Sequence, residues 1–168
     1  MNLKAPQILA ADTNVGVDVA QGDEWVLDAL STIRRRLPGS SLLVPPTVSE
    51  EFAWLVLHAD GAGERAAAHE FLRRHRKWGF QLLHTVPLGD AYVEKIAACL
   101  LRATLLPASE VNDAHILAEA AALGCSMLLT SDEHLRGIDF QRLGFELAPF
   151  DLAAPIIATP RDIVRRFF

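Results

Sequence analysis

Short runs of apolar residues alternate along the chain with longer stretches in which apolar residues recur every three or four positions. The runs occupy residues 8–11, 42–44, 80–86 and 127–130, with a weaker one at 144–148. Continuous apolar runs of this length predict strands that are buried on both faces. Because helical stretches separate them, we expect a mainly parallel sheet covered by helices on both sides.

The helical stretches have recognisable ends. The spacing of apolar residues predicts helices over 25–37, 47–58, 64–77, 90–101 and 113–123. Thr47 and Glu50 have the spacing of a capping box, in which each residue bonds the backbone of the other. Thr159 followed by Pro160 predicts the start of a last short helix, with threonine as N-cap and proline in the first turn.

Length and composition indicate an ordinary globular protein. The 168 residues are 51% hydrophobic, which suits one domain spanning 1–168. Cys99 and Cys125 lack the spacing of a zinc site and are expected to be buried free thiols. The first apolar stretch is cut at Asp12, which fits neither a signal peptide nor a membrane span, so we expect a cytoplasmic protein.

The net charge of −5 does not favour nucleic-acid binding, because such proteins usually carry a basic surface. Basic residues are nevertheless clustered, and local basic patches can bind a phosphate backbone. The candidate substrate-binding residues are Arg34, Arg35, Arg36, Arg73 and Arg74. The alternative interpretation of these arginines is a solvated helix face.

Four carboxylates each adjoin an apolar run. Asp12 and Asp132 directly follow predicted strands, whereas Glu51 and Asp113 lie in the first turns of predicted helices. In parallel sheets ligands bind beyond the carboxyl ends of the strands, so the four acids should meet at one edge. Buried carboxylates need a partner that offsets their desolvation, and a divalent cation is such a partner.

Each acid also has a purely structural interpretation. Asp12 could be a turn or cap residue after its strand, and Asp132 could cap a helix that begins at Glu133. Asp113 could complement a helix dipole, but it shares a helix face with the apolar residues Ile116 and Leu117. The convergence of all four acids at one edge favours a functional site over these separate explanations.

Glu50 and Glu51 compete for the same position in this group. Helical geometry alone does not choose between them, because both have large apolar neighbours. The capping-box spacing gives Glu50 a structural role, so Glu51 is the preferred ligand and Glu50 the alternative.

Four segments resemble the successive motifs of PIN-domain nucleases, most closely those of VapC-type toxin ribonucleases. They are Ala11-Asp12-Thr13-Asn14-Val15, Glu51-Phe52-Ala53-Trp54-Leu55, Asn112-Asp113-Ala114-His115-Ile116-Leu117-Ala118 and Leu129-Thr130-Ser131-Asp132-Glu133-His134-Leu135. The resemblance extends from about Ile8 to the last helix, and so over nearly the whole chain.

The resemblance implies a three-layer α/β/α sandwich with a mainly parallel central sheet, and metal-dependent endoribonuclease activity. It implies Asp12, Glu51, Asp113 and Asp132 as catalytic, metal-binding residues for Mg²⁺ or Mn²⁺, with Asn14 and Thr130 as polar supporting residues. It further implies RNA as substrate, an antitoxin protein as partner if the chain is a toxin, and a homodimer.

Two other functions compete with this hypothesis. A non-catalytic PIN-like module would bind RNA or a protein without cutting, yet binding alone does not require four acids at one edge. A phosphoacceptor signalling domain also gathers acids at strand ends. That domain needs a lysine near the last of these strands, and residues 127–135 contain none.

Overall fold

Five short strands form one parallel sheet at the centre of the molecule. The computed structural model describes residues 6–167. Its strands are β1 (Ile8–Ala11), β2 (Ser41–Val44), β3 (Phe80–Leu82), β4 (Met127–Leu129) and β5 (Ile156–Ala158). They lie in the order β3-β2-β1-β4-β5, and every neighbouring pair is parallel. The order reverses direction at β1, which is where such sheets bind ligands.

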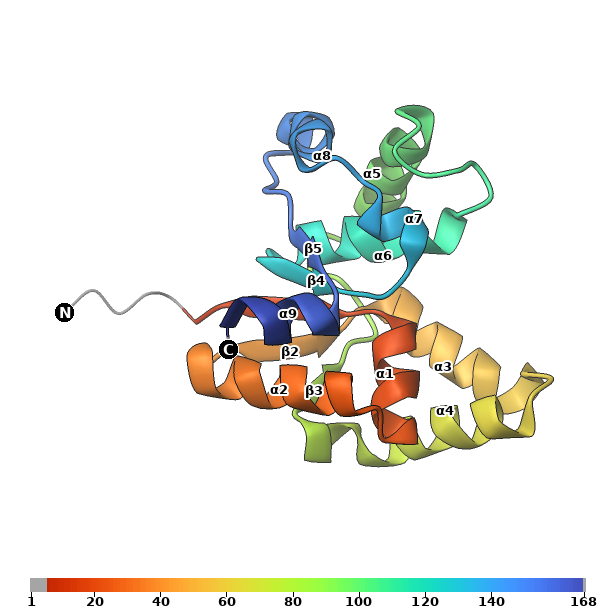
Figure 1. Cartoon of the computed structure of the whole chain (residues 1–168). Coiled ribbons are helices and arrows are strands. Elements are labelled where there is room, and N and C mark those ends of the chain that lie inside the picture. Colours follow the sequence, from red (N-terminus) through yellow and green to blue (C-terminus); the bar gives the residue numbers. More distant parts are fainter. Residues whose placement is uncertain (1–5, 168) are drawn as a thin grey trace.

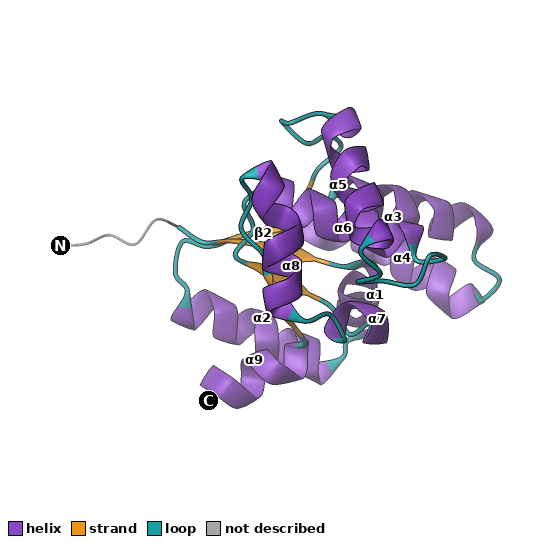
Figure 2. Ribbon diagram, turned by 90° about the horizontal axis from the view of Figure 1, so that it is seen from above, coloured by secondary structure: helices purple, strands orange, loops and turns teal. Residues whose placement is uncertain are grey.

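Helices cover both faces of this sheet and make a three-layer α/β/α sandwich. Figure 1 shows α5, α6 and α8 on one side and α1, α2 and α4 on the other, and Figure 2 shows the sheet between them. The helices are α1 (Thr13–Gln21), α2 (Glu24–Arg36), α3 (Pro46–His58), α4 (Ala62–Arg74), α5 (Asp90–Arg102), α6 (Val111–Ala122), α7 (Glu133–Arg136), α8 (Phe140–Leu147) and α9 (Pro160–Phe167). Two 3₁₀ turns, His75–Trp78 and Ala148–Phe150, follow α4 and α8. None of the helices within residues 6–167 is long and apolar enough to cross a membrane.

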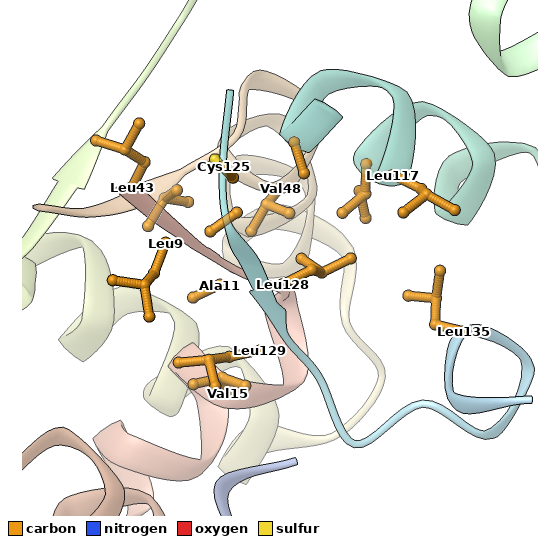
Figure 3. Packing of buried hydrophobic residues seen from close by; sticks show 14 of the residues in the cluster. Leu9, Ala11, Val15, Leu43, Val48, Leu117, Cys125, Leu128, Leu129 and Leu135 are labelled. Atoms are coloured by element: carbon orange, nitrogen blue, oxygen red, sulfur yellow. The ribbon is translucent and has the colours of Figure 1, made fainter. Parts of the chain in front are cut away.

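The core lies on both sides of β1 and β4. Leu9 and Leu128 are fully buried, and Figure 3 shows them among side chains from the flanking helices, such as Val15 of α1 and Leu117 of α6. A strand buried on both faces has no polar side, which explains the continuous apolar runs of the sequence. The predicted mainly parallel sheet is confirmed.

The weak strand predicted at 144–148 is wrong. These residues belong to α8 and the 3₁₀ turn after it, and the last strand is β5. Leu143 and Leu147, four residues apart, are both fully buried, whereas Phe145 between them is 76% exposed. This is the period of a helix, and Asp139 caps its first turn by accepting a hydrogen bond from the backbone of Arg142.

Two helix starts test the predicted caps. At α9, Thr159 Oγ1 accepts a hydrogen bond from Asp162 N, and the Asp162 carboxylate accepts from Thr159 N, which confirms the predicted start. At α3 the capping box does not form, because the N-cap is Pro45 and Thr47 bonds Glu119 instead. The other predicted helices begin and end within about three residues of the observed ones. The sequence pattern did not predict α1.

Candidate active site

Asp12 stands at the carboxyl end of β1 and caps the helix that follows. Its Oδ1 accepts a hydrogen bond from Thr13 N at 2.6 Å. Its Oδ2 accepts from Asn14 Nδ2 and from Thr130 Oγ1, each at 2.7 Å. A carboxylate offers about four acceptor positions, so these three donors fix its orientation and leave roughly one position open.

The surroundings of Asp12 disfavour its charged form. The residue is only 5% exposed. Burial, and to a smaller extent the charges of Glu51 and Asp132, raise its pKa to about 6, although the hydrogen bonds from Thr130 and Thr13 act in the opposite direction. The ion pairs within residues 6–167 include none of the four predicted acids. A bound cation would therefore offset an uncompensated charge.

Asp113, in the first turn of α6, faces the same negative field. It is half-buried and accepts no hydrogen bond from the described part of the chain. Its pKa is raised to about 7, mostly by burial and further by the charges of neighbouring acids, which are Asp132, Asp12, Glu110 and Glu51. Asp113 thus receives the least compensation from the protein for its charged form, and both of its oxygens are available to a ligand.

Asp132 follows β4 and caps the short helix α7. One oxygen, Oδ1, accepts from His134 N at 2.8 Å and Leu135 N at 3.0 Å. The other oxygen accepts no hydrogen bond from the residues that the structure describes. The cap role considered for Asp132 is therefore real, and it leaves Oδ2 free to bind a ligand at the same time.

Glu51 reaches the site from α3. Its Oε2 accepts a hydrogen bond from Thr13 Oγ1, and its Oε1 accepts from Asn112 Nδ2 at 2.9 Å. Thr13 and Asn112 are the chain neighbours of Asp12 and Asp113, so these bonds tie Glu51 to both aspartates. Glu50 is exposed and makes no capping bond to Thr47. The capping box was therefore the wrong reason for preferring Glu51, although Glu51 is the glutamate beside the aspartates.

A buried carboxylate on α6 holds the beginning of α3. Glu119 is 6% exposed and accepts hydrogen bonds from Thr47 N, at 3.0 and 3.2 Å, and from Thr47 Oγ1, at 2.8 Å. It thereby satisfies an N–H that the first turn of a helix leaves without a partner. This contact joins the helix that bears Glu51 to the helix that bears Asp113.

Three of the four predicted acids line one pocket. Asp12, Asp113 and Asp132 surround a hollow of about 320 Å³ at the carboxyl edge of the sheet. Glu51 lines an adjoining pocket of about 600 Å³, together with the exposed Trp54 of the same helix. The two pockets share Thr13, Leu55 and Glu64 as walls.

A second group of ligand atoms overlaps this site. Glu110, Asp113 and His134 each provide one oxygen or nitrogen, and these atoms lie within 4.8 Å of one another. Among residues 6–167, no three of the four predicted acids come that close. Glu110 was missed by the sequence reasoning. Its position one helical turn before Asp113 was the available signal.

The predicted basic residues lie away from these carboxylates. Arg34 donates to the carbonyl oxygen of Trp78 at 2.8 Å. Because Trp78 lies two residues before β3 begins, Arg34 is near the amino edge of the sheet. Arg73 and Arg74 pair with Glu70 near the end of α4. The structure thus brings the acids together at one edge and places these arginines elsewhere.

Comparison with known proteins agrees with this arrangement. A search of curated proteins found no match. Among solved structures, the fold is similar to a chain of VapBC2 from Rickettsia felis, bound there to a DNA fragment from the promoter, with a TM-score of 0.63. The two chains are 14% identical, and the match covers 91% of this chain and 98% of that one. The model of the PIN domain matches residues 10–141. The chain therefore belongs to the PIN domain family.

Proposed function

We propose that this protein is a divalent-metal-dependent endoribonuclease, with Asp12, Glu51, Asp113 and Asp132 holding Mg²⁺ or Mn²⁺. One observation supports this most directly. Asp12, Asp113 and Asp132 come from separate segments, line one pocket, and include two carboxyl groups whose pKa is raised to about 6 and about 7. Perturbed acids gathered in a pocket are typical of functional sites.

The donor set fits a hard divalent cation. All four residues offer carboxylate oxygens, which Mg²⁺ and Mn²⁺ prefer. Within residues 6–167, Asp113 has two oxygens without a hydrogen-bond donor, Asp132 has one, and Asp12 has about one acceptor position left. These oxygens are available without breaking any contact that holds the fold.

The chain's own residues position the reactants. Thr130 and Asn14 bond Asp12 Oδ2 and fix the direction of that carboxylate, while Asn14 Oδ1 accepts from Ser131 N and so links β1 to the loop after β4. Thr13 orients Glu51. When bound, the metal would lower the pKa of a water and stabilise charge on the phosphodiester oxygens.

Cleavage of a mixed RNA pool tests the proposal. Purified protein should cut RNA in Mg²⁺ or Mn²⁺, and cutting should stop with a chelator or with Asp12→Asn or Asp113→Asn. The Asp28→Asn variant is the matched control, because Asp28 is exposed on α2 and lines neither acidic pocket. A wild-type protein that binds RNA and never cuts it would support the non-catalytic alternative instead.

We further propose that a protein partner acts as antitoxin by covering the acidic pockets. The pocket beside Glu51 also contains Glu50, Glu64 and the exposed Trp54, so it suits a basic side chain that packs on an aromatic ring. The similar fold of a VapBC2 chain supports such a pairing. Co-purification of a small protein that inhibits cleavage is expected, and growth unaffected by strong expression of the lone chain would contradict a toxin role.

A further inference from the structure

A second polar pocket, of about 360 Å³, opens beside the acidic one. It lies between α1, α2 and α9, and its walls include Arg136, Arg161, Arg165 and Trp25. Asp18 lines both pockets, and Ser131, which also lines this one, directly precedes Asp132. The pocket is therefore at the same edge of the sheet as the carboxylates.

The three arginines are available to a ligand. All three are exposed, and within residues 6–167 none of their side chains makes an ion pair or a hydrogen bond. Arg161 lies 5.4 Å from the centre of the Trp25 ring, a cation–π arrangement that stiffens its side chain. A guanidinium held in this way can bind a phosphate through two hydrogen bonds.

The carboxylates of the same pocket are engaged in holding helices. Asp23 Oδ1 accepts from Val26 N and caps α2. The Asp162 carboxylate accepts from Thr159 N and Oγ1, bonds that lower its pKa, and the charges of Arg166 and Arg136 lower it further. Asp18 is half-buried and has a raised pKa because of burial and the nearby charge of Asp23. Asp23 and Asp162 therefore have structural roles, whereas the exposed guanidinium groups remain open to a ligand.

We propose that this arginine pocket, defined by Arg136, Arg161, Arg165 and Trp25, binds the phosphates of an RNA strand that extends from the acidic pocket. The inference rests on the proposed function, because the acidic pocket must take the scissile phosphodiester. The next phosphates of an RNA strand bound in the acidic pocket must lie on a neighbouring surface. The arginine pocket is such a surface, because Asp18 lines both pockets. Trp25, which is 38% exposed, adds an aromatic face on which a base can stack.

Binding of a labelled single-stranded RNA, measured against salt concentration, tests the proposal. All proteins carry Asp113→Asn and are measured with a chelator, so cleavage does not interfere. The test variant is Arg161→Gln with Arg165→Gln. The matched control is Arg76→Gln with Lys77→Gln, which removes the same charge from exposed residues near the opposite edge of the sheet.

The test variant should bind RNA about tenfold more weakly, and its slope of log affinity against log salt should fall by about 0.7 for each phosphate that the protein no longer neutralises. The control variant should differ from its parent by about twofold or less. Equal affinity and equal slope in the two double variants would overturn the proposal, as would a parent that binds no RNA. Salt-dependent binding through these arginines, found together with a wild-type protein that never cleaves RNA in Mg²⁺ or Mn²⁺, would uphold the arginine pocket as a phosphate-binding surface and refute the proposed activity.

Discussion

Asp113 is the residue on which both candidate groups of ligands depend. It faces Asp12 and Asp132 across one pocket, and it is also within 4.8 Å of ligand atoms of Glu110 and His134. No donor in the described part of the chain bonds its carboxylate, so replacing it by an amide changes charge without breaking a contact. Because of this isolation, a substitution at Asp113 reports on ligand binding more cleanly than one at Asp12, which also caps α1.

We expect Asp113→Asn to weaken Mn²⁺ binding by about tenfold or more, because it removes a ligand shared by both groups. Glu110→Gln removes the same charge one helical turn away and should weaken binding by only about threefold. Calorimetric titration with Mn²⁺ measures both. If Glu110→Gln has the larger effect, the ion sits on Glu110, Asp113 and His134 and not on the predicted quartet.

Gly16 shows how closely α1 packs on its neighbours. A Cβ at this position would lie 2.5 Å from the ring of Phe52, which in turn stacks on Phe71 with ring centroids 4.3 Å apart. Gly16→Ala should therefore lower the free energy of unfolding by about 1–3 kcal/mol. Urea unfolding measures the loss. Gly63→Ala is the control, because a Cβ there would have no atom within 4 Å beyond its chain neighbours and the backbone of its own helix, and alanine favours the helix by roughly 0.5–1 kcal/mol.

At the scale of elements, the bond between Glu119 and Thr47 sets the position of α3 relative to α6. Glu119→Gln replaces one of the two acceptor oxygens by an NH₂ group, a donor that faces the N–H and O–H donors of Thr47, and should lower the free energy of unfolding by about 1–3 kcal/mol. A cycle with Thr47→Val should give a coupling energy of about 1 kcal/mol, measured by urea unfolding. Cleavage should fall as well, since Glu51 lies one turn further along α3. Additive effects of the two substitutions would show that the bond contributes no stability.

The same bond explains where sequence reasoning failed. A capping box is a local rule, and it predicted a partner for Thr47 three residues away, whereas the actual partner is on another helix. Continuous apolar runs identified β1, β2 and β4 because both of their faces are buried. The apolar run at 144–148 gave a wrong strand prediction because it belongs to a helix. Only one face of that helix, with Leu143 and Leu147, is buried. The four acids were predicted at one edge from two strand ends and two helix starts. The arginine pocket depends on loops and on α9, whose packing against α2 no local pattern shows.

For the whole molecule, the raised pKa values of Asp12 and Asp113 couple stability to pH. Both pKa values lie above the ordinary value of 3.8, at about 6 and about 7. Between pH 4 and pH 7 the folded protein therefore binds more protons at these groups than the unfolded chain does. Stability from these groups is highest at low pH and is lost as the pH rises through the folded-state values.

A divalent cation should reverse this loss, because it replaces the protons as the partner of the ionised carboxylates. We expect Mn²⁺ to raise the melting temperature more at pH 7.5 than at pH 5, where protons still occupy the site. Thermal unfolding at both values, with and without Mn²⁺, measures the difference. The melting temperature of the Asp12→Asn, Asp113→Asn double variant should not rise with Mn²⁺. It should also lack the loss of stability that ionisation of these two carboxyl groups causes as the pH rises. A wild-type melting temperature that Mn²⁺ raises equally at both pH values would place the binding outside these carboxylates, because their occupancy by protons must weaken binding of the cation.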